Sequence, residues 1–255
     1  MNKFLFVILT VLFVSTSFYK VENSENTSIS PLLEKEQSPD HIIKENEKSA
    51  LKSSAEIYTA LNFENINKLT SEVFDKAFLG FENLKKAGKL DSSAHLLTVC
   101  DFSLSSTKKR LWVIDVNEKK IVFNSLVAHG KNTGEEFAQK FSNTESSLQS
   151  SLGFYITETT YNGSNGYSLK LLGMDPGYND AALQRAIVMH GADYVSENFV
   201  KNQKRLGRSW GCPAVPRELA EPIINTIKGK NCLFIYYPDT QYLSSSKWLK
   251  SDVNS

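Results

Sequence analysis

The ten residues RLGRSWGCPA, at positions 205–214, set one of only three cysteines of the chain between a glycine and a proline. Two arginines and a tryptophan precede Cys212 in the same stretch. A structural cysteine lies among apolar residues, whereas a reactive thiol needs partly exposed and electropositive surroundings. The stretch therefore predicts that Cys212 is a nucleophile.

The other two cysteines have different neighbours. Cys100 lies in LLTVCDF and Cys232 in NCLFIYY, and both runs are typical of buried strands. We interpret these residues as inert core thiols, although a disulfide between them is open, because spacing alone does not determine pairing.

The order of histidines along the chain limits the choice of base. Histidines occur at positions 41, 95, 129 and 190, so none follows Cys212, which excludes a papain-like peptidase. His190 ends the strand-like run AIVMH and is followed by Gly191, a position typical of catalytic groups at the rim of a sheet. His129 precedes a glycine in SLVAHGKNTG in the same way and is the rival candidate.

The neighbours of Cys212 suggest how a site could be built. Backbone N–H groups from Ser209 to Cys212 could bind a developing oxyanion, and Gly211 would let a substrate approach the backbone. Arg205 and Arg208 could bind a substrate carboxylate, or could be solvated surface residues.

Several other classes of function lack support. The net charge of +1 and the absence of a basic block give no basis for binding nucleic acid. The run HGKNTGEE lacks the spacing of a phosphate-binding loop. His190, Asp193 and Cys212 could be zinc ligands, but no paired ligand spacing supports this. We predict no metal and no cofactor.

The region after residue 90 has the texture of a mainly β domain. Short apolar runs are separated by breaks such as NGSNG and MDPGYND, which predicts a β-sandwich or barrel-like sheet over residues 91–240. The run PRELAEPIINTIK predicts one helix that begins near Pro216. Residues 53–90 form a predicted helical segment that packs on this domain through Phe74, Ala77, Phe81 and Leu84, and residues 241–255 are left as a tail.

The first residues, MNKFLFVILTVLFVSTSFYK, resemble an export signal. Lys3 is followed by an apolar run too short to span a bilayer comfortably and then by small residues, so we predict a signal peptide over residues 1–17. An uncleaved anchor is the alternative. Residues 18–52 have the composition of a flexible tether. The mature protein is then expected in the periplasm or cell envelope, without stable membrane insertion.

Four ordered motifs resemble the catalytic domain of murein L,D-transpeptidases of the YkuD type. They are HGKNTG, SSLGFYITETTYNGSNGYSLKLLG, IVMHGADYVS and GRSWGCPAVP, all between residues 125 and 216. The resemblance implies a β-rich fold, with Cys212 as nucleophile and His190 as base. The usual cysteine motif of the family is Ser/Thr-His-Gly-Cys, so Ser209, Gly211 and Cys212 match while Trp210 replaces a histidine.

The resemblance also implies the substrate, which is a peptidoglycan stem tetrapeptide, and inhibition by carbapenems. It assigns Ser209 and Gly211 to the catalytic loop, and we expect Arg208, Trp210, Gly191 and His129 around the substrate. His129 could supply part of the polar function of the missing histidine. A carboxypeptidase with the same site, a sortase-like transpeptidase and a non-catalytic wall-binding protein are the alternatives.

Overall fold

The computed structural model describes residues 53–251. By contacts the chain divides into units of Met1–Gln37 and Ser38–Ser255, and every described residue belongs to the second unit. The expected signal peptide (residues 1–17), the expected tether (residues 18–52) and the last four residues lie outside the described part.

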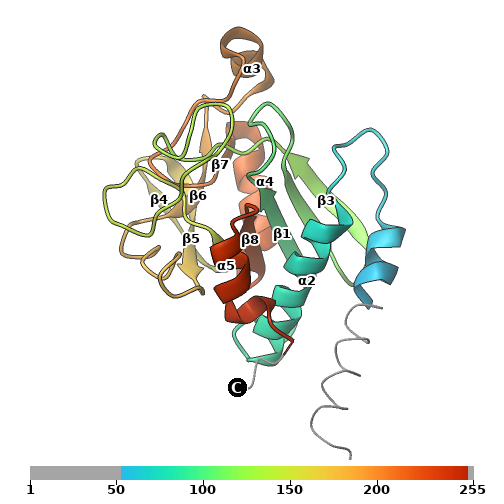
Figure 1. Cartoon of the computed structure of the whole chain (residues 1–255). Coiled ribbons are helices and arrows are strands. Elements are labelled where there is room, and N and C mark those ends of the chain that lie inside the picture. The colour runs from blue at the N-terminus through green and yellow to red at the C-terminus, as the bar shows by residue number, and fades with distance from the viewer. Residues whose placement is uncertain (1–52, 252–255) are drawn as a thin grey trace, which may run out of the picture. The chain divides into compact units, whose positions relative to one another are not determined.

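One eight-stranded sheet forms the centre of the domain (Figure 1). Its strand order is β3-β2-β1-β8-β4-β5-β6-β7, and most neighbours are antiparallel, except that β1 pairs with β8 and β6 with β7 in parallel. The strands are β1 (Leu96–Asp101), β2 (Leu111–Asp115), β3 (Lys120–Ser125), β4 (Gly153–Gly163), β5 (Gly166–Gly173), β6 (Val188–Ala192), β7 (Ala214–Pro216) and β8 (Cys232–Tyr236).

The two ends of this strand order approach each other. Ala128, just after β3, forms an antiparallel bridge with Ala214 of β7, and its N–H donates to the Ala214 carbonyl at 2.8 Å. The sheet therefore nearly closes into a barrel, and the predicted mainly β, barrel-like architecture is confirmed. The apolar runs of β1, β2, β6 and β8 are buried along their whole length, which is how continuous apolar strands pack inside a sheet that is covered on both faces.

The N-terminal helical segment packs on this sheet. Residues 53–60 are helical, and α2 (Ser71–Lys86) follows with Thr70 as its N-cap. The α2 stripe predicted from the sequence is buried, and α2 packs against β1 and β8. The helix ends at Lys86, and Gly88, with φ of +64°, provides the left-handed turn that stops it.

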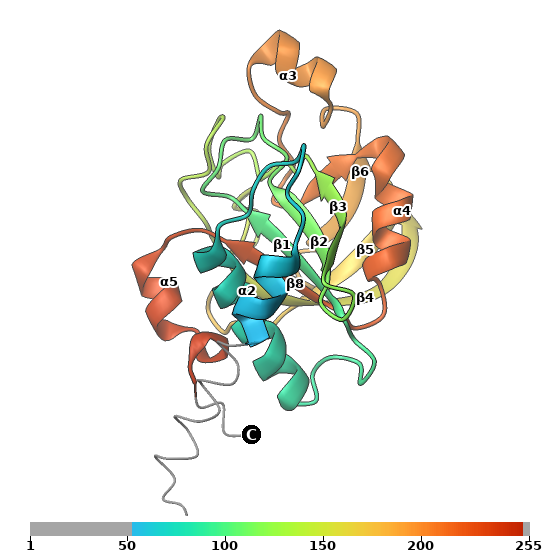
Figure 2. The ribbon, with the colours of Figure 1, turned by 90° about the vertical axis from the view of Figure 1, so that its right-hand side faces the viewer.

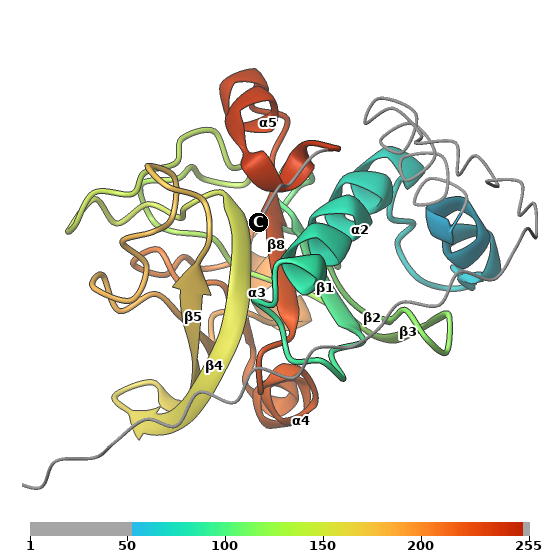
Figure 3. The same ribbon diagram turned by 90° about the horizontal axis from the view of Figure 1, so that it is seen from below.

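The remaining helices lie at other places on the sheet. α4 (Arg217–Ile227) packs against β5, β6 and β7, away from α2, as the views from the side and from below show (Figures 2 and 3). Pro216 is the residue just before α4 and not its first residue. α3 (Glu197–Gln203), which the sequence did not predict, projects from the loop between β6 and β7.

Residues 241–251, left as a tail by the sequence, belong to the packed domain. They contribute most of α5 (Thr240–Ser245) and the 3₁₀ helix η1 (Lys247–Leu249). Tyr242 and Trp248 are buried there, and Asn83 of α2 donates to the backbone carbonyls of Trp248 and Lys250 at 2.9 Å. Two aromatic side chains that lose water contact explain why this segment docks.

Cys100 and Cys232 lie in the core, and all three cysteines are free thiols. In the parallel pair β1–β8, Cys232 is opposite Leu97 while Cys100 is opposite Ile235. A shift of three residues along a strand separates the two cysteines by roughly 10 Å, which is too far for a disulfide.

Candidate active site

Cys212 and His190 line one cavity of about 440 Å³. The β4–β5 hairpin, the segment 185–190 and the loop 208–212 form most of its wall. Its lining residues are Tyr161, Ser164, Asn165, Arg185, Ala186, Ile187, Val188, His190, Tyr194, Arg208, Ser209, Trp210 and Cys212. The predicted nucleophile and base, 22 positions apart in sequence (212 − 190), therefore share one cavity.

The register of two parallel strands brings them together. His190 of β6 is opposite Ala214 of β7, so Cys212 lies level with Val188. The Val188 N–H donates to Sγ of Cys212 at 3.4 Å, and Sγ lies 3.7 Å from the Ala186 carbonyl oxygen. The backbone of residues 186–188 thus holds the sulfur from one side.

Ala186 has a positive φ of 53°, which is unfavourable for a residue with a Cβ. Strain of this kind persists where the surrounding structure fixes the backbone, and it is common at functional sites. Here the strained carbonyl faces the thiol of Cys212. Burial raises the pKa of the Cys212 thiol, whereas the Val188 N–H and the charge of Arg185 act against this rise.

Ser209 fixes the turn that carries Cys212. Its Oγ accepts a hydrogen bond from the Gly211 N–H at 3.1 Å and donates to the Cys212 carbonyl at 2.6 Å. Its backbone N–H donates to the His129 carbonyl, and its carbonyl accepts from the Lys131 N–H. Ser209 therefore positions the turn, and two of the N–H groups expected to face an oxyanion, those of Ser209 and Gly211, are already bonded within the protein.

Gly211 is required by the protein backbone. Its φ is +129°, and a Cβ there would lie 2.7 Å from the Gln149 carbonyl oxygen and 3.0 Å from Cδ1 of Ile187. The sequence predicted that this glycine leaves space for a substrate, but the space is occupied by residue 149. The Ser150 hydroxyl also donates to the Gly211 carbonyl at 3.0 Å.

We predict that Gly211→Ala moves the Cys212 sulfur and lowers kcat/KM by about 10²-fold, because small displacements of reacting groups cost rates of this order. Gly177→Ala is the matched control, since Gly177 also has a positive φ (+79°) but no atom lies within 4 Å of its added Cβ. Steady-state kinetics and thermal melts of both variants check the prediction. Equal kcat/KM values for the two variants would contradict it.

His190 has the protonation geometry of a base. The residue is 4% exposed, and Nδ1 lies 3.0 Å from the Gly191 carbonyl oxygen, which can only accept. Nδ1 therefore carries the proton and Nε2 keeps a lone pair, for which no residue from 53 to 251 provides a hydrogen bond. Burial lowers the pKa of His190, and Arg217 acts in the same direction, so the ring is neutral at pH 7.

Gly191 supports His190 and is not part of the cavity wall. Its carbonyl holds the ring, and a Cβ at this position would lie 2.9 Å from Cβ of Ala220 and 3.1 Å from Cα of Arg217. The glycine allows α4 to pack closely on β6. A direct role in binding substrate, which the sequence suggested, is therefore not seen in this structure.

The structure does not bring the His129 ring to the cavity. The ring is 1% exposed, Nδ1 lies 2.7 Å from Nη2 of Arg110, and Nε2 lies 3.2 Å from the Gly134 carbonyl oxygen. Since Arg110 can only donate and a carbonyl only accept, the proton is on Nε2. Burial, with help from Arg110, lowers the pKa of His129 to about 3. His129 is a neutral structural residue.

This burial predicts acid sensitivity. In the unfolded chain His129 binds a proton near pH 6.5, whereas the folded ring stays neutral down to about pH 3. The contribution of the neutral ring to the free energy of unfolding is therefore complete above pH 6.5 and is lost as the pH falls. Between pH 6.5 and 4 the loss is up to about 3 kcal/mol. His129→Gln preserves a donor and an acceptor without titrating, and denaturant unfolding at several pH values should show a weaker pH dependence for this variant. Identical slopes would contradict the assignment.

Arg205 and Arg208 share one counterion. Nε of Arg205 lies 3.1 Å from Oε2 of Glu135, and Nη1 of Arg208 lies 2.6 Å from Oε1 of the same side chain. Of the two arginines only Arg208 lines the cavity. The role of Arg208 in binding a substrate carboxylate stays a prediction.

Trp210 lies at the rim of the cavity and is 78% exposed. Tyr161, on the β4–β5 hairpin, is 39% exposed and lines the same cavity. An exposed tryptophan side chain contributes little to folding, and exposed aromatic surface marks contact sites for ligands. The predicted place of Trp210 next to a bound substrate is consistent with this exposure.

Sequence reasoning missed Arg185. Arg185 is the first residue of the run RAIVMHG. The neighbouring sequence does not indicate its role, because its hydrogen-bond partners lie between residues 142 and 151. The guanidinium lines the cavity and adds positive charge close to Cys212.

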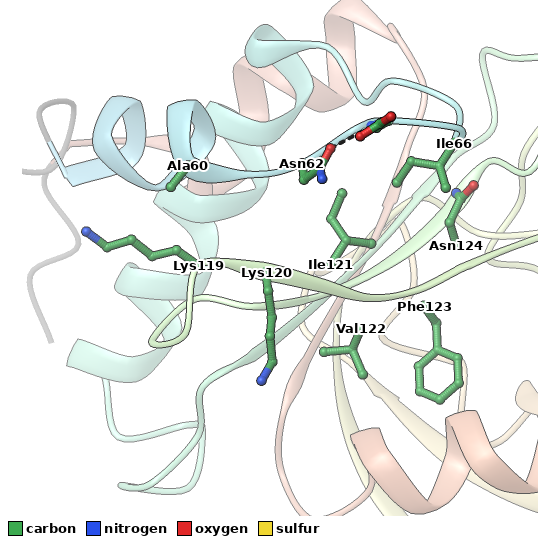
Figure 4. A pocket seen from close by; sticks show the side chains of 10 residues that line it. Ala60, Asn62, Ile66, Lys119, Lys120, Ile121, Val122, Phe123 and Asn124 are labelled. Atoms are coloured by element: carbon green, nitrogen blue, oxygen red, sulfur yellow. Dashed lines mark hydrogen bonds between the residues drawn. The ribbon is translucent and has the colours of Figure 1, made fainter.

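A second cavity, of about 410 Å³, lies between the segment after the first helix and β3 (Figure 4). Its wall contains two lysines, Lys119 and Lys120, but no histidine or cysteine. Figure 4 shows Ile66 and Ile121 on the side where the segment faces the strand. It lacks a nucleophile–base pair, so the cavity of Cys212 is the candidate active site.

Within residues 53–251, no group of three or more His, Cys, Asp or Glu side chains has an arrangement that could hold a metal ion. Among the helices of the same residues, none is both long and apolar enough to cross a bilayer.

Comparison with known proteins identifies one family. The family model for the L,D-transpeptidase catalytic domain matches residues 65–236, which is more than half of the chain and includes both Cys212 and His190. No curated protein matches the chain.

Solved L,D-transpeptidase structures are similar at low identity. The structure from Mycobacterium smegmatis is 11% identical, with 56% of this chain and 59% of that chain covered and a TM-score of 0.35. The structure from Mycobacterium tuberculosis H37Rv is 14% identical, with 56% of this chain and 58% of that chain covered and a TM-score of 0.33. The structure from Stackebrandtia nassauensis is 11% identical, with 77% of this chain and 93% of that chain covered and a TM-score of 0.35. The chain thus spans about 59% of the length of the first mycobacterial structure.

Proposed function

Given that this chain belongs to the L,D-transpeptidase catalytic domain family, we propose that it is an exported cysteine acyltransferase that acts on peptidoglycan stem tetrapeptides. The observation that carries the proposal is that one cavity is lined by both Cys212, whose sulfur contacts Ala186 and Val188 of the same wall, and His190, whose Nε2 has a free lone pair. A thiol and a neutral imidazole in one cavity are the two groups that acyl transfer through a thioester needs.

The first half-reaction transfers the acyl group to the enzyme. Nε2 of His190 takes the proton of the Cys212 thiol, and sulfur attacks the carbonyl carbon between the third residue, an L-centre, and the terminal D-alanine. The tetrahedral intermediate collapses when His190 gives the proton to the nitrogen of D-alanine and the C–N bond breaks. D-alanine leaves, and the C–S bond of a thioester remains.

Two N–H groups are suited to the negative charge of the intermediate. Within residues 53–251 the backbone N–H groups of Trp210 and Cys212 donate to no other oxygen, whereas those of Ser209 and Gly211 are bonded. We therefore assign the oxyanion site to Trp210 and Cys212. Donors that are already oriented stabilise such charge strongly because they need no rearrangement during the reaction.

The second half-reaction depends on the acceptor. A side-chain amine of another stem peptide attacks the thioester, His190 removes the amine proton and returns it to the departing thiolate, and a cross-link forms. Water in place of the amine gives an L,D-carboxypeptidase, and a free amino acid gives exchange. The exposed rim of Trp210 and Tyr161 leaves room for an acceptor peptide to enter.

Location and inhibition follow from the same proposal. The apolar run after Lys3 supports export to the periplasm or cell envelope, where stem peptides are found. A carbapenem presents a strained carbonyl to the same cavity, and attack by Cys212 would give a stable acyl-enzyme. We therefore expect inactivation by carbapenems.

The proposal is tested by incubating the purified protein with a disaccharide-tetrapeptide and analysing the products by mass spectrometry. A cross-linked dimer or a tripeptide, with release of D-alanine, is expected. A disaccharide-tripeptide, which lacks the terminal D-alanine, is the matched control and should give no dimer by itself. Unchanged tetrapeptide from folded protein would contradict the proposal and favour a non-catalytic wall-binding protein.

A further inference from the structure

Arg185 directly precedes residues 186–188, which contact the Cys212 sulfur from one side. The next residue, Ala186, presents its carbonyl to Sγ, and Val188 donates its N–H to the same atom. Arg185 itself lines the cavity together with Cys212. A cation thus lines the same cavity as Cys212, next in sequence to the residues that contact the sulfur.

The guanidinium of Arg185 is fixed by four hydrogen bonds to neutral acceptors. Nη1 donates to the Ser142 carbonyl at 2.7 Å and to the Ser151 hydroxyl, and Nη2 donates to the Ser147 hydroxyl at 3.1 Å and to the Gln149 carbonyl at 2.7 Å. All donors on the two terminal nitrogens are therefore occupied, so this group is poorly suited to gripping a substrate carboxylate.

The same bonds hold the wall behind the nucleophile. The Gln149 carbonyl oxygen, which Arg185 binds, is the atom nearest to the place where a Cβ at Gly211 would lie, at 2.7 Å, and Ser150 donates to the Gly211 carbonyl. Arg185 therefore connects segment 142–151 to the turn of Cys212.

The charge of Arg185 has no counterion among residues 53–251, since none of their carboxylates lies within ion-pair distance of it. The other titratable or charged side chains on the cavity are Tyr161, His190, Tyr194 and Arg208. Arg208 is paired with Glu135, which it shares with Arg205. His190 is neutral because burial lowers its pKa, and burial raises the pKa of Tyr194 to about 12. Of the two arginines on the cavity, Arg185 is therefore the one that no carboxylate of residues 53–251 pairs with.

We propose that Arg185 is a positioning residue that favours the thiolate form of Cys212 by a fixed positive charge and keeps the wall behind Gly211 in place. The inference rests on the proposed function only in taking Cys212 as the nucleophile. Burial raises the pKa of the Cys212 thiol, and the charge of Arg185 lowers it. An opposite charge nearby shifts a pKa by about 1–3 units.

The test measures the pKa of the thiol without any substrate. Alkylation of Cys212 by iodoacetamide is followed from pH 5 to pH 11 in the wild type, Arg185→Lys and Arg185→Gln, with Cys212→Ala as the blank for Cys100 and Cys232. We expect the Arg185→Gln midpoint to rise by about one unit or more, which slows alkylation below the midpoint by about tenfold. Arg185→Lys keeps the positive charge, so its midpoint should lie close to that of the wild type. Arg205→Gln, whose side chain is outside the cavity, should leave the midpoint unchanged.

A second variant keeps the arginine and cancels its charge. Ser147→Asp places a carboxylate at Nη2 of Arg185, and Ser147→Asn is its neutral control. We expect a raised midpoint for the aspartate variant alone, even if Arg185→Gln does not fold. Unchanged midpoints in folded Arg185→Gln or in Ser147→Asp would overturn the inference. Because no substrate is used, a shifted midpoint in a protein without transpeptidase activity would uphold this role and reject the proposed function.

Discussion

Cys212→Ala protein is expected to release no D-alanine and to form neither tripeptide nor dimer from a disaccharide-tetrapeptide. The loss in turnover should be at least about 10³-fold, because removing a nucleophile removes the covalent route and leaves only binding and charge stabilisation. Cys212 contributes a small, partly buried side chain, so the fold should survive. Mass spectrometry of the products and a thermal melt check both statements.

Cys100→Ala is the matched control for this variant. Cys100 is completely buried in β1, and its burial raises the pKa of the thiol to about 12. This change should lower the free energy of unfolding by about 1–2 kcal/mol through lost packing while turnover is retained. Activity in Cys212→Ala, or its loss only in Cys100→Ala, would refute the assigned nucleophile.

His190→Gln is expected to lower kcat/KM by about 10²–10⁴-fold, the usual contribution of a general acid–base group. In the wild type, kcat/KM should fall as pH falls, because protonated His190 cannot accept the thiol proton. Burial lowers the pKa of His190, so this decline should have its midpoint below the ordinary histidine value of about 6.5. Rates measured from pH 4 to 8 test the midpoint.

The surface histidine provides the comparison. His95 is 41% exposed and lies 3.8 Å from Asp115, outside the cavity. His95→Gln should keep both the rate and the decline of kcat/KM at low pH (the acid limb). In His190→Gln this acid limb should disappear from the residual activity. An acid limb that persists in His190→Gln would assign the titrating group elsewhere.

Much of the fold could be predicted because its signals are local. Apolar runs bounded by glycine, asparagine and proline mark the strands, and the spacing of Phe74, Ala77, Phe81 and Leu84 marks the buried face of α2. Cys212 and His190 could be found because a glycine-flanked cysteine and a histidine at a strand end both have an informative local context. The family match covers both residues, and their catalytic roles stay a prediction.

The missed features all depend on partners far away in sequence. His129 has the same local context as His190, yet its ring contacts Arg110 and does not line the cavity. The reason for Gly211 is the Gln149 carbonyl, and the role of Arg185 depends on residues 142–151. Burial of Trp248 likewise depends on α2, so the end of the chain could not be distinguished from a tail.

The central claim, that Cys212 carries the acyl group, is tested most directly by intact-protein mass spectrometry. The wild type is mixed with excess disaccharide-tetrapeptide, quenched in acid within the first turnovers and then digested. We expect a mass gain equal to the substrate minus D-alanine, located on the peptide that contains Cys212 and released by hydroxylamine as a thioester should be. A folded, active enzyme that carries no adduct, or one that carries it at another residue, would contradict the account.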